Sequence, residues 1–119
     1  MGKRIAGTCY VKADGVQFEV KGGLECPLLD VKKEPVVASR GVAGFKETVI
    51  APYVKLTAIF TADFPIAKLQ SATDLTVTAE YANGKVYVLS EAWVANEASA
   101  KGEEGEAELE FNGISGVWQ

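Results

Sequence analysis

The sequence predicts a mainly β fold, an antiparallel β-sandwich or barrel of about seven strands with one short flanking helix and a long hairpin arm. Apolar and polar residues alternate with a period of two over most of the chain, as they do in half-buried strands. Asp14-Gly15 and Asn83-Gly84 are dipeptides that close β-hairpins. Only residues 63–70 have the features of a helix.

Size and composition indicate one globular domain over residues 1–119. The chain is 48% apolar and 24% charged, which is typical of soluble proteins with a packed core. Apolar runs are too short for a signal peptide or a transmembrane helix. We therefore expect the chain to be made in the cytosol and to bind no membrane.

The net charge disfavours nucleic-acid binding, and the absence of histidine disfavours catalysis and metal binding. The formal net charge is −4, and basic residues never run to more than two in succession. Nucleic-acid-binding modules gather basic residues on one face, so this class is disfavoured. Without histidine, the chain lacks the usual general base and the commonest metal ligand.

The first predicted hairpin joins residues 4–12 to residues 16–21. Both runs alternate apolar and polar side chains, and Asp14-Gly15 between them tolerates a positive φ at each position. We expect Gly22-Gly23 to end the second strand.

Residues 28–52 predict the arm. They read as extended chain, turned over by Gly41 and Gly44, and Pro35 restricts its strand to an edge. The segment is too apolar for a solvated loop and too charged for a core strand, so we expect it to lie against another surface, such as a second copy of the chain. The apolar candidates for this subunit contact are Val36, Val37, Val42, Phe45, Val49 and Ile50.

A strand over residues 53–61 precedes the predicted helix. Asp63 is placed to cap that helix and Pro65 suits its first turn, which predicts about two or three turns.

The second predicted hairpin joins residues 75–81 to residues 86–94 through a type I′ turn at Asn83-Gly84. The returning strand is apolar on both faces, which predicts a central strand or one covered by the helix.

The last strand, residues 106–111, alternates glutamates with apolar residues. Glu106, Glu108 and Glu110 point one way and Ala107, Leu109 and Phe111 the other. A face with these carboxylates must meet water or a basic partner. We expect the apolar end, residues 113–118, to pack back onto the fold.

No group of residues predicts catalysis, so we expect no enzyme activity, no metal and no cofactor. The acidic run over residues 103–110 lacks the order of an EF-hand, and the glycine pairs do not lie between a strand and a helix. Cys9 and Cys26 lie far apart and outside any CxxC motif, which favours reduced, partly buried thiols and leaves a disulfide open.

Three segments, residues 4–15, 22–69 and 74–119, resemble in their order and spacing the tail tube protein of Mu-like contractile-tailed phages and prophages, the Myoviridae-type tail tube family. The resemblance implies a β-sandwich with one flanking helix that assembles into six-fold rings. The rings would stack into a tube that conducts DNA without binding it specifically.

The same resemblance implies the partners and the location. The subunit would associate with itself, with a surrounding contractile sheath protein, with a tape measure protein in the lumen, and with the baseplate or tail-initiation proteins. It would be assembled in the host cytoplasm and reside in the virion tail, with no cofactor and no catalysis.

By analogy with this family, the lumen candidates are Asp74, Thr76, Thr78 and Glu80. Glu106, Glu108 and Glu110 would then face the sheath. The reverse assignment stays open, as does simple solvation of both faces.

Other classes remain as alternatives. One is a related ring-forming component, such as the tube protein of a secretion system or a tail terminator. Another is a monomeric β-barrel that binds a small ligand, although the sequence offers no convergent polar groups to orient one.

Overall fold

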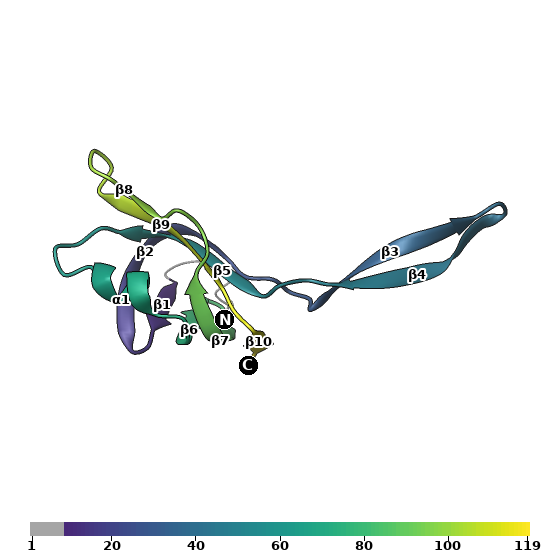
Figure 1. The fold of residues 1–119 in the computed structure, drawn as a ribbon, viewed down its shortest axis with the longest axis horizontal. Helices are drawn as coiled ribbons and strands as arrows, with labels where there is room; N and C mark the ends of the chain where they lie inside the picture. The colour runs from purple at the N-terminus through teal and green to yellow at the C-terminus, as the bar shows by residue number, and fades with distance from the viewer. Residues whose placement is uncertain (1–8) are drawn as a thin grey trace, which may run out of the picture.

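A computed structural model describes residues 9–119, which form a compact body and a long projecting arm (Figure 1). The strands are β1 (Tyr10–Ala13), β2 (Val16–Glu25), β3 (Val31–Ala38), β4 (Gly41–Val49), β5 (Tyr53–Ile59), β6 (Leu75–Glu80), β7 (Val86–Val94), β8 (Ser99–Lys101), β9 (Glu106–Asn112) and β10 (Ser115–Trp118). One helix, α1 (Ile66–Ser71), lies among these residues between β5 and β6.

The body is a barrel of antiparallel strands. Eight strands pair in the order β10-β7-β6-β1-β2-β5-β9-β8, and a further pairing joins β7 to β9. In that pairing Trp93 lies opposite Asn112 and Val94 opposite Phe111. The extra pairing closes six strands, β7, β6, β1, β2, β5 and β9, and leaves β8 and β10 attached at the sides.

The predicted fold class is therefore confirmed: the chain is mainly β and antiparallel, with one short helix in the described region and a hairpin arm. The predicted count of about seven strands is low, because the described chain has ten. β8 has three residues and β10 has four, too few to display an alternating pattern.

The core fills the barrel with side chains from every strand of the closed ring. The largest fully buried side chains are Phe111, Leu56, Leu75, Leu89, Leu109, Val11, Val54 and Val77. Each of these contributes about 1.5–3 kcal/mol by leaving water, which makes the barrel the stable part of the molecule.

The first hairpin turns at Asp14-Gly15, as predicted. Both residues have positive φ, 48° and 85°, which is the requirement of a type I′ turn. The expectation that Gly22-Gly23 ends the second strand is wrong, since β2 continues to Glu25. Register shifts on both sides of Gly22 bend β2 while it stays paired with β5. Residues 4–8 of this prediction lie outside the described residues.

The second hairpin has the predicted strands and a different turn. Gly84 has a positive φ of 91° and Asn83 does not, so a type I′ turn is wrong. The amide of Gly84 donates to the carbonyl of Tyr81 at 3.0 Å, and the amide of Tyr81 donates to the carbonyl of Lys85 at 2.9 Å. This is a longer loop in which a type I turn is followed by a left-handed glycine. The side chain of Asn83 supports it by accepting from the amide of Lys85 at 3.0 Å.

β7 is central, as predicted, because it pairs with β6, β9 and β10. Its alternation changes at Glu91, which has a positive φ of 52° and lies where the register with β6 shifts. Tyr87 and Leu89 point into the core before this bulge and Ala92 does so after it. Trp93, which strict alternation would place on the side of Tyr87 and Leu89, is consequently 36% exposed.

The helix is shorter than predicted, with six residues. Asp63 does not cap it: the N-cap position is Pro65, and the Asp63 carboxylate accepts a hydrogen bond from the Thr61 hydroxyl at 2.6 Å. Phe64 lies between Asp63 and Pro65 in the chain, and its ring centroid is 5.5 Å from that of Phe18 in the core. Packing of this ring fixes the chain before α1 and sets where the helix begins.

Candidate subunit interfaces

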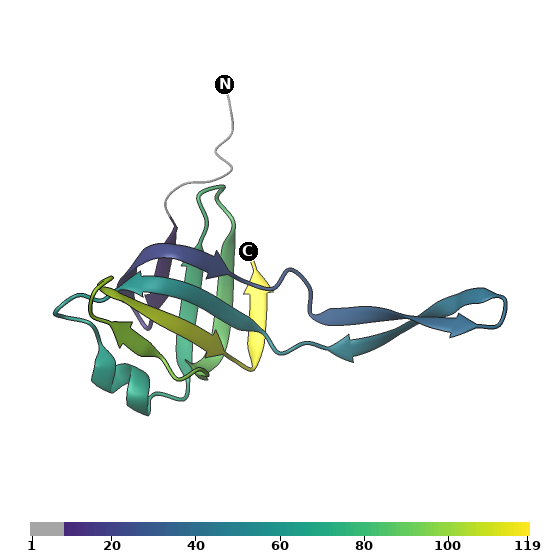
Figure 2. The same cartoon turned by 90° about the horizontal axis from the view of Figure 1, so that it is seen from above.

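The arm is a two-stranded hairpin of β3 and β4 that leaves the body between β2 and β5 (Figure 2). Every residue of β4 is exposed. The chain reverses at Ser39-Arg40, and Gly41 follows with a φ of 126°. Gly44, predicted to take part in the turn, instead lies within β4 opposite Val36. It stands beside a bulge that leaves the neighbouring Ala43 unpaired.

Cross-strand pairing gives the arm two chemically different faces. Residues that pair across a sheet share a face, and alternate residues along a strand share it too. Three apolar pairs therefore lie together, which we call the apolar face of the arm: Val31 with Val49, Pro35 with Phe45, and Val37 with Val42.

The opposite side, which we call the charged face of the arm, carries ion pairs. Glu34 lies 3.3 Å from the Nζ of Lys32 and 3.7 Å from the Nζ of Lys46. On the apolar face the only charged pair is Lys33 with Glu47, and Lys33 Nζ lies 5.2 Å from the centre of the Phe45 ring. A lysine in this position covers part of one face of the Phe45 ring and leaves the ring exposed to water.

The structure brings four of the six predicted arm residues onto the apolar face. Val37, Val42, Phe45 and Val49 are 71%, 71%, 60% and 83% exposed. Val36 lies on the charged face, and Ile50 is half-buried just beyond β4, where its amide donates to the carbonyl of Asp30 at 3.0 Å.

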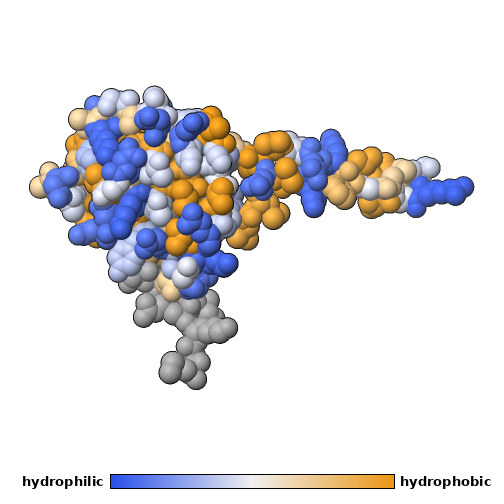
Figure 3. Space-filling model, turned by 90° about the horizontal axis from the view of Figure 1, so that it is seen from below, coloured by the Kyte–Doolittle hydropathy of each residue, from blue (hydrophilic) through white to orange (hydrophobic). Residues whose placement is uncertain are grey.

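Exposed apolar surface continues from the arm to its junction with the body (Figure 3). Leu28 and Leu29, which precede β3, are 81% and 68% exposed. Contiguous apolar surface of this kind is uncommon on monomers and marks interaction sites.

The predicted lumen residues lie on the outer side of β6. Thr76, Thr78 and Glu80 share this side, because Leu75, Val77 and Ala79 alternate with them and are buried. Asp74 precedes the strand and is exposed. Two neighbours that sequence reasoning missed, Lys12 opposite Thr78 and Tyr10 opposite Glu80, complete this surface from β1.

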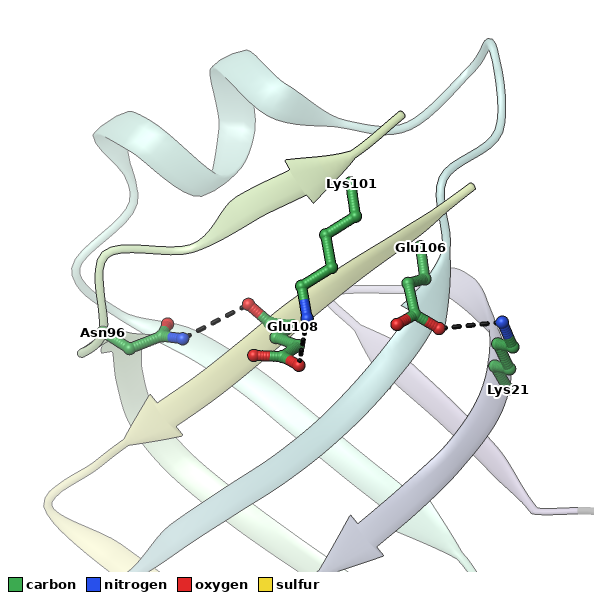
Figure 4. A network of polar contacts seen from close by, with 5 residues as sticks. All are labelled: Lys21, Asn96, Lys101, Glu106 and Glu108. Carbon is green, nitrogen blue, oxygen red and sulfur yellow. Dashed lines mark hydrogen bonds and ion pairs between the residues drawn. The ribbon is translucent and has the colours of Figure 1, made fainter. Parts of the chain in front are cut away.

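The three glutamates of β9 share the outer side of the sheet, as predicted, while Ala107, Leu109 and Phe111 are buried. Two of the three already form ion pairs with lysines of the same chain (Figure 4). Glu106 lies 2.9 Å from the Nζ of Lys21 and its side chain is only 15% exposed. Glu108 lies 3.0 Å from the Nζ of Lys101, and its carboxylate raises the pKa of that lysine.

Backbone contacts anchor the same face of β9. The side-chain nitrogen Nδ2 of Asn96 donates to the backbone carbonyl of Glu108 at 3.2 Å, and its Oδ1 accepts from the backbone amide of Glu110 at 3.2 Å. Glu110 lies opposite Lys55 of β5 in the sheet. The sequence pattern predicted the carboxylates correctly and missed the lysines, which come from strands distant in the chain.

An open groove of about 510 Å³ lies between α1, β8 and β9. Its apolar lining includes Phe60, Phe64, Ile66, Leu69, Val94 and Ala107. A second hollow, of about 370 Å³, is formed by Cys26, Leu28, Tyr81, Asn83, Lys85 and Trp118.

Trp118 closes the second hollow and fixes the end of the chain. Its indole nitrogen donates to the carbonyl of Pro27 at 2.8 Å, and its ring centroid lies 4.9 Å from that of Tyr87 and 5.7 Å from that of Tyr81. The expectation that the apolar C-terminal end packs onto the fold is confirmed for Trp118. Ile114 and Val117 remain 66% and 55% exposed.

The cysteines are both thiols. Burial raises the pKa of Cys26 to about 11, against the opposing effect of a hydrogen bond with Tyr81. A thiol held in its protonated form is a poor nucleophile.

Over residues 9–119, no three His, Cys, Asp or Glu side chains are arranged to hold a metal ion. None of the helical structure described in the chain is long and apolar enough to cross a membrane.

The model of the phage tail tube protein family matches residues 2–118 of the chain. The chain belongs to this family. Its members are structural proteins, so this tail tube chain is a component of the virion tail. A search of the curated proteins finds no match.

Solved structures share the fold of this tail tube chain. The sheath/tube terminator of an extracellular contractile injection system, PVC, in its extended state is similar with a TM-score of 0.67 at 8% identity, over 100% of this chain and 98% of that one. The tube-terminating cap of the anti-feeding prophage, AFP, is similar with a TM-score of 0.62 at 12% identity, over 100% of this chain and 93% of that one.

Proposed function

We propose that the chain is the ring-forming subunit of a phage tail tube, in which rings stack to form the DNA conduit inside a contractile sheath. The observation that carries this proposal is the arm, which holds exposed apolar side chains away from its own body. None of residues 9–119 covers these side chains, and other copies of a structural subunit are available to do so.

Contact between the arm of one copy and the body of the next is heterologous, because two different surfaces meet. Such contacts generate closed rings or open helical filaments rather than simple dimers. Within a ring, the outer edges of β8 and β10, which end the sheet, are available for strand pairing between subunits. Hexameric rings are the state that the family resemblance favours.

The outer side of β6 suits the wall of a DNA conduit. On this surface Thr76 and Thr78 present hydroxyls and Glu80 a carboxylate. Lys12 on β1 is the neighbouring basic residue. A surface without clustered lysine and arginine would not retain phosphates, so DNA would pass without specific binding.

The sheath would then meet the opposite outer surface, around β9. Glu110 and Glu108 are candidates for contact with basic residues of the sheath, since Glu108 stays 52% exposed beside Lys101, while Glu106 is paired with Lys21 and largely covered. A tape measure protein in the lumen and baseplate or tail-initiation proteins at the tube end complete the expected partners, and assembly would take place in the host cytoplasm.

Negative-stain electron microscopy of the purified protein over a range of concentrations tests the proposal. We expect stacked rings or long tubes with an open centre. Uniform small particles at every concentration, also after a tail-initiation complex is added, would contradict it.

A tail terminator is the second candidate, and the similarity in fold to an injection-system tube terminator and to a tube-terminating cap favours it. A terminator forms a single ring that ends a tube and does not extend one. Single rings that never stack, at concentrations where a tube protein elongates, would favour this function. A ligand-binding barrel has less support, because side chains fill the barrel interior.

A further inference from the structure

We infer that the apolar face of the arm docks in the groove between α1, β8 and β9 of a second copy of the chain. This inference rests on the proposed function, which makes the arm a contact between subunits, and it names the receiving surface on the neighbour.

The groove has the chemistry of a receptor for apolar side chains. Phe60 and Ile66 on its lining are 39% and 50% exposed, and the buried side chains of Ala107 and Leu109 form its floor. Its volume of about 510 Å³ is in the range of sites that enclose compact apolar ligands. A single aromatic side chain with flanking valines would occupy such a space and release water from both partners.

The arm supplies that arrangement. Phe45 is the only aromatic residue of the hairpin, and Val37 and Val42 form the adjacent pair on the apolar face. The exposed fraction of the Phe45 side chain, 60%, leaves it available as an anchor.

The arm and the groove lie at opposite ends of the molecule. In both Figure 1 and Figure 2 the arm extends to one side of the body, while α1 and β8 lie on the far side. An arm therefore cannot fill the groove of its own chain. It can reach the groove of the next copy, which produces the head-to-tail contact that a ring or a tube requires.

Charge favours the same partner. The arm carries four basic and two acidic side chains over residues 31–49, so its formal charge is +2. The other residues include eight basic and fourteen acidic side chains, a formal charge of −6. Opposite charge steers the arm towards the body of another copy.

Charged groups near the groove are mostly acidic. Glu97 lines it, and Glu103 and Glu104 lie in the turn between β8 and β9. The nearby lysines are engaged elsewhere: Lys101 pairs with Glu108, and Lys68 of α1 lies 3.4 Å from the carbonyl of Asp14. Arg40 at the arm tip and Lys33, which lies beside Phe45 on the apolar face, would meet this acidic rim.

Complementary variants of the full chain test the inference. Ala100 pairs with Ala107 across β8 and β9 and lines the groove, so Ala100→Trp should fill the groove of a copy whose arm is intact. Phe45→Asp should disable the arm of a copy whose groove is intact. Lys101→Trp, on the other face of β8, and Thr48→Asp, on the charged face of the arm, are the matched controls.

Sedimentation velocity with one fluorescent partner measures the association. We expect each of Ala100→Trp and Phe45→Asp alone to self-associate at least about tenfold more weakly than the wild type, the loss typical of a central interface residue. Mixed together, they should form a complex, because one donates an arm and the other a groove. Both control variants should assemble as the wild type does.

Three results would overturn the inference. If Ala100→Trp assembles like the wild type, the arm docks elsewhere and the proposed function stands. If the mixture forms no complex although both variants keep wild-type unfolding curves, the arm and the groove are not partners. If the wild type itself never self-associates, with or without a tail-initiation complex, the inference and the proposed function fail together.

Discussion

Two glycines near the C-terminus occupy positions where no side chain fits. A Cβ at Gly113 would lie 2.8 Å from Leu89, and a Cβ at Gly116 would overlap the hydroxyl of Tyr87. Both glycines lie against β7, the strand that joins the two sides of the barrel. The close approach of β10 to β7 therefore depends on residues that have no side chain.

We expect Gly116→Ala to lower the free energy of unfolding by about 1–3 kcal/mol, the usual cost of overpacking a tight contact. The added methyl must displace the Tyr87 ring, which is buried and packed on Trp118. Urea denaturation followed by tryptophan fluorescence would measure the change.

Gly102→Ala is the matched control, because a Cβ there meets nothing within 4 Å and the backbone has no positive φ. Its free energy of unfolding should differ from that of the wild type by less than about 0.5 kcal/mol. Equal effects of the two substitutions would contradict the packing of β10 on β7.

Cys26 gives a second prediction at the scale of a residue. Its pKa, raised by burial from the ordinary 9.0 to about 11, leaves about a hundredfold less thiolate near neutral pH, since each pKa unit is a tenfold change. In a Cys9→Ser background, we expect iodoacetamide to alkylate Cys26 at least about tenfold more slowly than the unfolded chain, because a thiolate of higher pKa is also the stronger nucleophile and offsets part of the loss. Similar rates for the folded and unfolded chains would show that the thiol is not buried as described.

At the scale of the element, the two ion pairs of β9 differ in burial. Glu106 is largely covered, so Lys21→Met would leave a partly buried carboxylate without its partner. We expect this substitution to lower the free energy of unfolding by about 1–2 kcal/mol. Lys101→Met, which removes the exposed partner of Glu108, should leave it nearly unchanged. Urea denaturation measures the free energy of unfolding of both variants. A larger loss of stability in Lys101→Met than in Lys21→Met would contradict the prediction.

Sequence reasoning predicted the strands whose side chains alternate between core and water. The glutamates of β9 and the turn at Asp14-Gly15 follow directly from period and turn chemistry. Local irregularities were not predicted. The bulge at Glu91 shifts the phase of β7 by one residue, and a strand pattern read from sequence assumes constant phase.

The sequence likewise predicted some features of the candidate interfaces and missed others. Alternation within each limb predicted most of the apolar side of the arm, but cross-strand register decides which apolar residues share a face. That register placed Val36 with the charges and added Val31 and Pro35 to the apolar face. The neighbours of β6 and β9, such as Lys12 and Lys21, depend on which distant strands pair, which a single sequence does not encode locally.

At the scale of the whole molecule, folding and assembly are assigned to separate parts. The buried core lies entirely in the body, and β3 and β4 contribute no buried residue to it. Stability should therefore be insensitive to the arm, while association should depend on it.

Replacement of Val31–Val49 by a short Gly-Ser turn tests this separation. We expect the shortened chain to keep the thermal unfolding midpoint of the wild type, because the arm buries no core side chain. We expect it to sediment as a monomer at concentrations where the wild type forms rings or tubes, because the exposed apolar face is gone. Calorimetry at concentrations where both chains are monomeric compares the unfolding midpoints, because association would raise that of the wild type. Sedimentation velocity at higher concentrations compares their association. A large fall in the unfolding midpoint would mean that the arm supports the barrel, and normal tubes from a stable shortened chain would mean that assembly proceeds through the barrel strands alone.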